Sequence, residues 1–126
     1  MIRPIQLKDH EAVKEMLEAE GAIEDFPHLL ESEGYVEEEE GDIIGFFGYI
    51  IWNRIPVLRH FCVKKGYRGI KSTNKLINGY VDIVRKNKFK LMMFMTNETF
   101  RKLYEWKFRV KPFKQNNGIY YFLKEV

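Results

Sequence analysis

The chain has 126 residues, of which 45% are hydrophobic and 31% charged, and these values are typical of one globular domain and exclude a disordered segment. The single cysteine, Cys62, excludes an internal disulfide and favours a reducing, cytoplasmic location. The net charge of +3 hides an asymmetry, because residues 1–53 hold 3 basic and 14 acidic side chains, whereas residues 54–126 hold 18 basic and 4 acidic ones.

This asymmetry has two interpretations. The halves present surfaces for different partners, a cation for the first half and an anion such as a nucleotide or a nucleic acid for the second. Alternatively, the opposite charges attract each other within the fold. A membrane span is not expected, because the longest apolar stretch, residues 43–52, has about half the length that a span needs.

Hydrophobic spacing predicts a strand and two helices at the start of the chain. Residues 2–7 are expected to form a strand, and Asp9 is expected to cap a helix that runs to about residue 20. Gly21 should end that helix. Residues 25–32 have the pattern of a second, shorter helix.

Three strands are expected next. Residues 35–40 form the first, the pair Gly41-Asp42 predicts a hairpin turn, and residues 43–52 form the second. The third strand covers residues 57–64, and alternation assigns its side chains to two faces. One face carries Val57, Arg59, Phe61 and Val63, and the other carries Leu58, His60 and Cys62.

A basic, glycine-bearing loop at residues 64–69 precedes a helix over about residues 70–87. The first turns of this helix contain Lys71 and Lys75 but no acidic residue, although the positive end of the helix dipole favours negative charge. A bound anion would remove this conflict, since free backbone N–H groups at a helix start bind phosphates. The alternative is a solvated loop whose lysines point away. The candidate ligands of a pyrophosphate are Arg68, Gly69, Ile70, Lys71, Ser72 and Thr73.

The last part of the chain is expected to add a buried strand, a helix and a hairpin. Residues 89–95 form the strand and residues 97–106 the helix. Residues 108–113 and 118–124 form the hairpin around residues 115–117. The helix after residue 70 would then be a right-handed crossover between two parallel neighbours, the strands at residues 57–64 and 89–95.

The loop and helix after Val63 resemble those of the GNAT superfamily of acetyl-CoA-dependent N-acetyltransferases. The similarity lies in a strand that ends in Cys62-Val63, a loop that contains Arg68-Gly69, and the helix that follows. A second similarity is a late helix that opens at Asn97 and carries Leu103-Tyr104 near its end. The order of the elements agrees along nearly the whole chain.

This resemblance implies an α/β (α+β) fold over residues 1–126, with a mixed, largely antiparallel sheet of six to seven strands and about four helices. It also implies acetyl-CoA as the co-substrate. The backbone of Cys62 and Val63 would pair with the pantetheine arm, and the loop and helix start would bind the pyrophosphate. The family's loop carries small residues where this chain has Lys71 and Thr73.

The resemblance further implies two residues of the late helix as site residues. Asn97 would bind the cofactor arm and Tyr104 would protonate the departing thiolate, and the seven-residue spacing puts both on one helix face. For the general base, the candidates are His60 and the glutamates at residues 37–40. Alternatively, Asn97 caps the helix and Tyr104 is a packed aromatic.

The sequence thus predicts an N-acetyltransferase that transfers an acetyl group to a primary amine by direct attack on the thioester. The acceptor would be a small molecule or a protein, and a cationic acceptor would suit the acidic first half. The alternative is a catalytically inactive protein of the same fold with a binding or structural role. Nucleic-acid binding by the basic half is disfavoured, because its aromatic residues have the spacing of core residues. A homodimer is left open.

Overall fold

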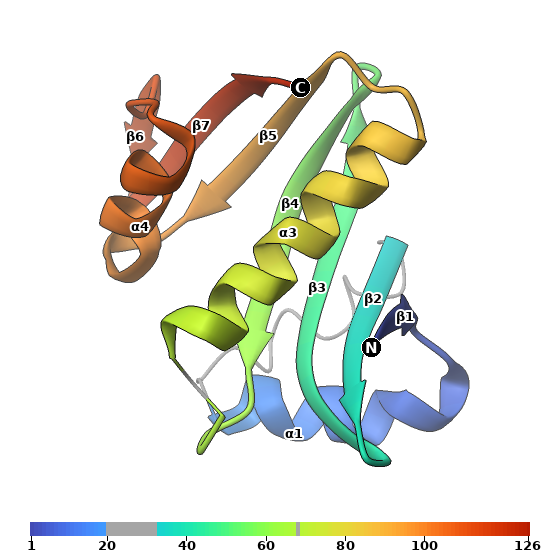
Figure 1. The fold of residues 1–126 in the computed structure, drawn as a ribbon. Helices are drawn as coiled ribbons and strands as arrows, with labels where there is room; N and C mark the ends of the chain where they lie inside the picture. The colour runs from blue at the N-terminus through green and yellow to red at the C-terminus, as the bar shows by residue number, and fades with distance from the viewer. Residues whose placement is uncertain (20–32, 68) are drawn as a thin grey trace.

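Seven strands form one mixed sheet in the computed structural model, which describes residues 1–19, 33–67 and 69–126 (Figure 1). All neighbouring strands are antiparallel except β4 and β5, which are parallel, as the sequence predicts. In sheet order, the strands are β1 (Ile2–Pro4), β2 (Glu33–Glu39), β3 (Asp42–Trp52), β4 (Ile55–Val63), β5 (Leu91–Thr96), β7 (Ile119–Glu125) and β6 (Lys114–Asn116).

Helices cover both faces of the sheet. The described residues contain a 3-10 turn at Leu7–Asp9 and the α-helices α1 (His10–Ala19), α3 (Ile70–Lys86) and α4 (Glu98–Phe108), so three α-helices are described where about four were expected. The predicted helix at residues 25–32 and the predicted helix end at Gly21 lie outside the described residues.

Two hydrophobic clusters fill the spaces between the helices and the sheet. Adjacent residues of β3 point to opposite faces, so that Phe46 packs with Val13 of α1 while Phe47 packs with Tyr80 of α3. Tyr104 of α4 belongs to the cluster of Phe47 and Tyr80. Figure 1 shows α3 lying along β4 and β3. The helix α3 connects β4 to its parallel neighbour β5.

The three hairpins share one turn geometry. Each loop has two residues, and both have positive φ: Glu40-Gly41, Asn53-Arg54 and Asn117-Gly118. This geometry matches the twist of the flanking strands. The turns predicted at Gly41-Asp42 and at residues 115–117 therefore lie at Glu40-Gly41 and Asn117-Gly118 instead. The register of the paired strands decides which residues remain unpaired in the turn.

The predicted strand at residues 108–113 is wrong. The helix α4 continues to Phe108, whose ring stacks on Phe94 with 4.7 Å between centroids, and this contact extends the helix beyond the expected end. Arg109 then has a positive φ of 53°, which is incompatible with a strand. The edge strand β6 begins only at Lys114.

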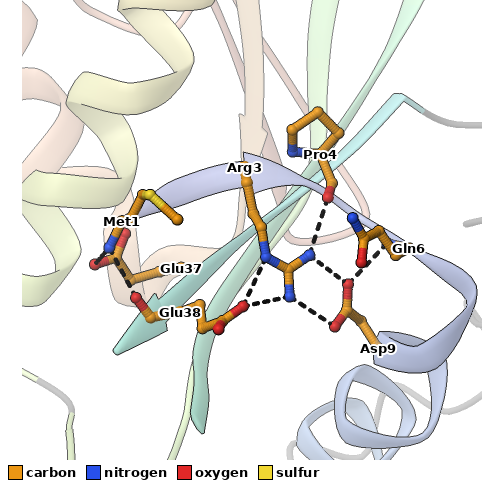
Figure 2. Close-up of polar contacts among 7 residues, drawn as sticks. All are labelled: Met1, Arg3, Pro4, Gln6, Asp9, Glu37 and Glu38. Atoms are coloured by element: carbon orange, nitrogen blue, oxygen red, sulfur yellow. Dashed lines mark hydrogen bonds and ion pairs between the residues drawn. The ribbon is translucent and has the colours of Figure 1, made fainter. Parts of the chain in front are cut away.

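Ion pairs join the start of the chain to β2, as Figure 2 shows. The guanidinium of Arg3 donates to both oxygens of Asp9, at 2.7 and 2.9 Å, and to Glu38 at 2.7 Å. The amine of Met1 donates to Glu37 at 2.8 Å. Basic groups of the first half itself thus balance part of the negative charge of that half.

Asp9 has a different capping role from the one predicted. It lies inside the 3-10 turn that precedes α1, and its carboxylate accepts a hydrogen bond of 2.7 Å from the backbone N–H of Gln6. The Arg3 guanidinium lowers the pKa of the Asp9 carboxyl below its ordinary value, although burial opposes this effect. The charged form of Asp9 therefore stabilises the connection between β1 and α1.

Candidate functional site

The strands β4 and β5 are paired at one end and diverge at the other (Figure 1). Their pairing consists of Val57 with Met93 and Leu58 with Phe94. At the joined end, the buried hydroxyl of Tyr80 lies 3.0 Å from the carbonyl oxygen of Pro56 and 3.1 Å from that of Met93. Tyr80 of α3 thus connects both strands where they meet, and the diverging ends leave a V-shaped opening.

A β-bulge lies at the start of this opening. Gly48 of β3 pairs with His60 and Tyr49 pairs with Leu58, so that no β3 residue stands opposite Arg59. The extra residue reverses the alternation of side chains. Leu58 consequently packs in the α3 cluster, whereas Cys62 packs in the α1 cluster. The predicted grouping of Leu58 with His60 and Cys62 is therefore wrong for Leu58.

A cleft of about 340 Å³ occupies the opening between the strands. It brings together His60 of β4, Tyr104 of α4 and Asn97, which directly precedes α4. These three residues were proposed from the sequence as parts of one site. The complete lining is Arg59, His60, Phe61, Met95, Thr96, Asn97, Phe100, Tyr104 and Ile119.

Tyr104 is buried among aromatic rings. The side chain is 1% exposed and packs against Phe94, Phe100 and Phe122, at centroid distances of 5.2 to 6.5 Å. Burial raises the pKa of its hydroxyl well above the ordinary value, so that it stays protonated at neutral pH. The packed-aromatic alternative is therefore confirmed, and the role of Tyr104 in the site stays a prediction.

Of the candidates for a general base, only His60 lines the cleft. His60 is 5% exposed, and it is the residue of β4 that follows the bulge. Glu37 and Glu39 line another cavity, and Glu38 binds Arg3. Among the candidate bases, His60 is thus the one that lines the same cleft as Tyr104.

The start of α3 has free backbone donors. No side chain caps the helix at Gly69, and the first intrahelical bond runs from the N–H of Thr73 to the carbonyl of Gly69, at 3.0 Å. The N–H groups at residues 70–72 therefore have no acceptor within the helix. A Cβ added at Gly69 would meet no atom within 4 Å, so the space above this backbone is open.

The two lysines at this helix start have different surroundings. Lys75 pairs with Glu37 of β2, with 2.6 Å between Nζ and Oε1, so its charge is balanced within the fold. Lys71 is exposed, and no ion pair joins it to another described residue. Thr73 is 7% exposed and Ser72 is partly buried. Arg68 and the side chain of Ile70 lie outside what the structure describes.

The side chains of Cys62 and Val63 are buried and do not line the cleft. Their backbone pairs with Phe46 and Gly45 of β3, and they lie beyond the part of β4 that pairs with β5. Val63 also lines a cavity of about 330 Å³ beside the start of α3, together with Lys71 and Ser72. The backbone of these two residues thus leads from the cleft toward the helix start.

The sequence interpretation missed two residues that shape the site. Arg59 was assigned only to a strand face, and no sequence signal marks a bulge there. Tyr80 was not singled out as a site residue, whereas its hydroxyl contacts both strands at the joined end of β4 and β5. A tyrosine among the aliphatic residues of a buried helix face is a weak signal of such a bond.

Searches of the described residues find no helix that is long and apolar enough to cross a membrane, and no group of three or more His, Cys, Asp or Glu side chains that could hold a metal ion.

The fold and the cleft define the class of the protein. The model of the acetyltransferase (GNAT) family matches residues 2–119, and the chain therefore belongs to this family. No curated protein matches the sequence significantly.

Solved structures with the same fold include three acetyltransferases of low sequence identity. A GNAT family acetyltransferase from Elizabethkingia anophelis with acetyl-CoA bound has a TM-score of 0.77 and 15% identity, over 100% of this chain and 97% of that one. The IAA acetyltransferase from Bacillus cereus has a TM-score of 0.78 and 14% identity, over 100% and 99%. The PaiA N-acetyltransferase from Thermoplasma acidophilum in complex with coenzyme A has a TM-score of 0.74 and 12% identity, over 100% and 98%.

Proposed function

We propose that the protein transfers an acetyl group from acetyl-CoA to a primary amine by direct attack of the amine on the thioester. The observation that carries this proposal is the cleft between the diverging strands β4 and β5. Within it, an imidazole, His60, and a protonated phenol, Tyr104, line the same space as Asn97. A base and an acid on one cleft are what acyl transfer from a thioester to an amine requires.

The residues around the start of α3 would hold the cofactor. The free N–H groups at residues 70–72 would bind the pyrophosphate, with Gly69 leaving room for close approach. Arg68 and Lys71 would supply positive charge, and Ser72 and Thr73 hydroxyl donors. The backbone of Cys62 and Val63 would bind the pantetheine arm, and Asn97 would hold its end.

Two proton transfers follow from this arrangement. The bound cofactor would supply the acetyl group as a thioester, which is reactive toward amines. His60 would accept the proton that the amine loses as its nitrogen forms the new C–N bond. Tyr104 would donate its proton to the sulfur as the C–S bond breaks, since burial keeps the phenol protonated.

The test combines binding with turnover. Titration calorimetry should detect binding of CoA and acetyl-CoA, and release of free thiol from acetyl-CoA should depend on added primary amines. His60→Gln should lower the rate of thiol release and leave CoA binding unchanged. Binding without turnover on a broad amine panel would instead favour an inactive GNAT-fold protein, and no binding at millimolar CoA would refute the cofactor proposal.

A further inference from the structure

We infer that Arg59 recognises a carboxylate on the acceptor, so that the substrates are amines that also carry an anionic group, such as amino acids. This inference rests on the proposed acetyl transfer and deepens it by naming the substrate class. Three observations carry it: the position of Arg59 at the bulge, the charge of the cleft, and the absence of a protein partner for this guanidinium among the described residues.

The bulge places Arg59 at the cleft. Pairing between β4 and β5 ends at Leu58 and Phe94, and Arg59 is the next residue of β4. Arg59 lines the cleft together with His60 and Tyr104. A group bound to Arg59 would therefore lie in the same space as the amine that loses its proton to His60.

The described lining of the cleft contains one permanent charge. Among its nine residues Arg59 is the only arginine or lysine, and none is an aspartate or a glutamate. Two acidic side chains of β2 are engaged elsewhere, because Glu37 pairs with Lys75 and Glu38 with Arg3. Over the described residues, the cleft thus favours an anion, in contrast to the cationic acceptor that the acidic first half of the sequence suggests.

Among the described residues Arg59 has no ion-pair partner, a property that it shares with the exposed Arg54, Arg85 and Arg109, but of these four only Arg59 lines the cleft. Arg3 binds Asp9 and Glu38, and Arg101 binds Glu98 and Glu105. Within residues 1–19, 33–67 and 69–126, no ion pair engages Arg59, and its side chain is exposed at the cleft. Guanidinium groups bind carboxylates through two parallel hydrogen bonds, so an acceptor carboxylate is the ligand that matches this free donor set.

The remaining lining indicates what accompanies the carboxylate. Phe61, Met95, Phe100 and Ile119 are apolar and would accommodate an apolar substituent of the acceptor. L-methionine and L-methioninamide are therefore a suitable probe pair, because they differ only in the carboxylate.

The first measurement is kcat/KM for both probes with the native protein, Arg59→Ala, Arg59→Lys and Arg85→Ala. Arg85 is an exposed arginine in the last turn of α3 and serves as the matched control. We expect the ratio of kcat/KM for L-methionine to that for L-methioninamide to fall about tenfold in Arg59→Ala, by about 1.4 kcal/mol. In Arg59→Lys the ratio should be partly restored, and in Arg85→Ala it should equal that of the native protein. Because the same ratio is compared between variants, the difference in basicity between the two amines cancels.

The second measurement does not need turnover. With the protein saturated by CoA, calorimetry should detect tighter binding of N-acetyl-L-methionine than of N-acetyl-L-methioninamide, and the difference should disappear in Arg59→Ala. Added salt should also reduce this difference in affinity in the native protein. This selectivity without any turnover would refute the acetyl transfer and leave the anion site standing. Equal binding of the two compounds, binding of neither, or a preference for the amide would overturn the role of Arg59.

Discussion

At the scale of single residues, Tyr104 offers the sharpest test of the chemistry. Replacing Tyr104 by Phe keeps the ring in its aromatic cluster and removes only the proton donor. We expect kcat to fall about a hundredfold. The free energy of unfolding and the Kd for CoA should change little, because burial alone accounts for the raised pKa and no hydrogen bond to another described residue is lost. Steady-state kinetics and urea unfolding check both statements; an unchanged kcat would remove Tyr104 from the mechanism.

Lys71 tests the cofactor site through its charge. Lys71→Glu should weaken CoA binding about tenfold, since a repulsive charge would then face the pyrophosphate. The apo protein should be equally stable or slightly more stable, because an acidic residue at a helix start gains about 0.3–1 kcal/mol.

Lys86→Glu at the opposite end of α3 is the matched control for Lys71→Glu. It should leave CoA binding intact and slightly destabilise the helix. A third variant, Lys71→Gly, shows whether the lysine obstructs the approach of the phosphates, in which case CoA should bind more tightly. Calorimetry on these variants distinguishes attraction of the phosphates by the lysine charge from steric obstruction by the lysine side chain. Equal affinities for CoA in the native protein and all variants would exclude Lys71 from the cofactor site.

At the scale of elements, Tyr80 connects α3 to the joined end of β4 and β5. Tyr80→Phe should lower the free energy of unfolding by about 1–3 kcal/mol, because the carbonyls of Pro56 and Met93 lose a buried donor. Faster hydrogen exchange at the amides of β5 should accompany this loss. Tyr121→Phe on β7 is the control, and a similar effect of both substitutions would mean that the bond to the two strands has no special role.

The order of the elements could be predicted because it depends on local spacing. Alternation and helical periodicity predicted six of the seven strands and all three described α-helices to within a few residues, and the helix between β4 and β5 predicted their parallel pairing. The bulge at Arg59 and the exact turn residues depend on which strands pair and in what register, and spacing along one strand does not contain that information.

The candidate site likewise combines residues that the sequence indicated with one that it did not. Asn97 and Tyr104 were selected by their resemblance to a family pattern, and His60 was selected as a candidate general base. The structure brings all three together on one cleft. Arg59 was not selected, because an exposed arginine on a strand has no sequence signal until the strand beside it diverges. The functional roles of all four residues stay predictions.

At the scale of the whole molecule, the ion pairs of the first half link stability to pH. The pKa of Asp9 is lowered in the folded protein by Arg3, so its charged form adds stability at neutral pH. This contribution is complete above the unfolded pKa of about 3.9 and is lost as the pH falls through the lower, folded value.

Asp9→Asn should therefore cost about 3 kcal/mol at pH 7 and flatten the acid limb of the stability curve. Asp82→Asn, at an exposed position of α3, should do neither. Thermal unfolding between pH 7 and pH 2 compares the three proteins. A curve for Asp9→Asn that runs parallel to that of the native protein would show that this carboxylate does not carry the acid sensitivity.

The outer edges of the sheet also bear on how the protein behaves in crowded solution. Both edge strands have three residues, and β1 contains Pro4, which has no N–H to offer, while β6 consists of the exposed polar residues Lys114, Gln115 and Asn116. Short, polar or proline-containing edges give a second chain little backbone to pair with. The seven-stranded sheet is thus protected against edge-to-edge aggregation, so that concentrated samples should resist the formation of extended β-aggregates.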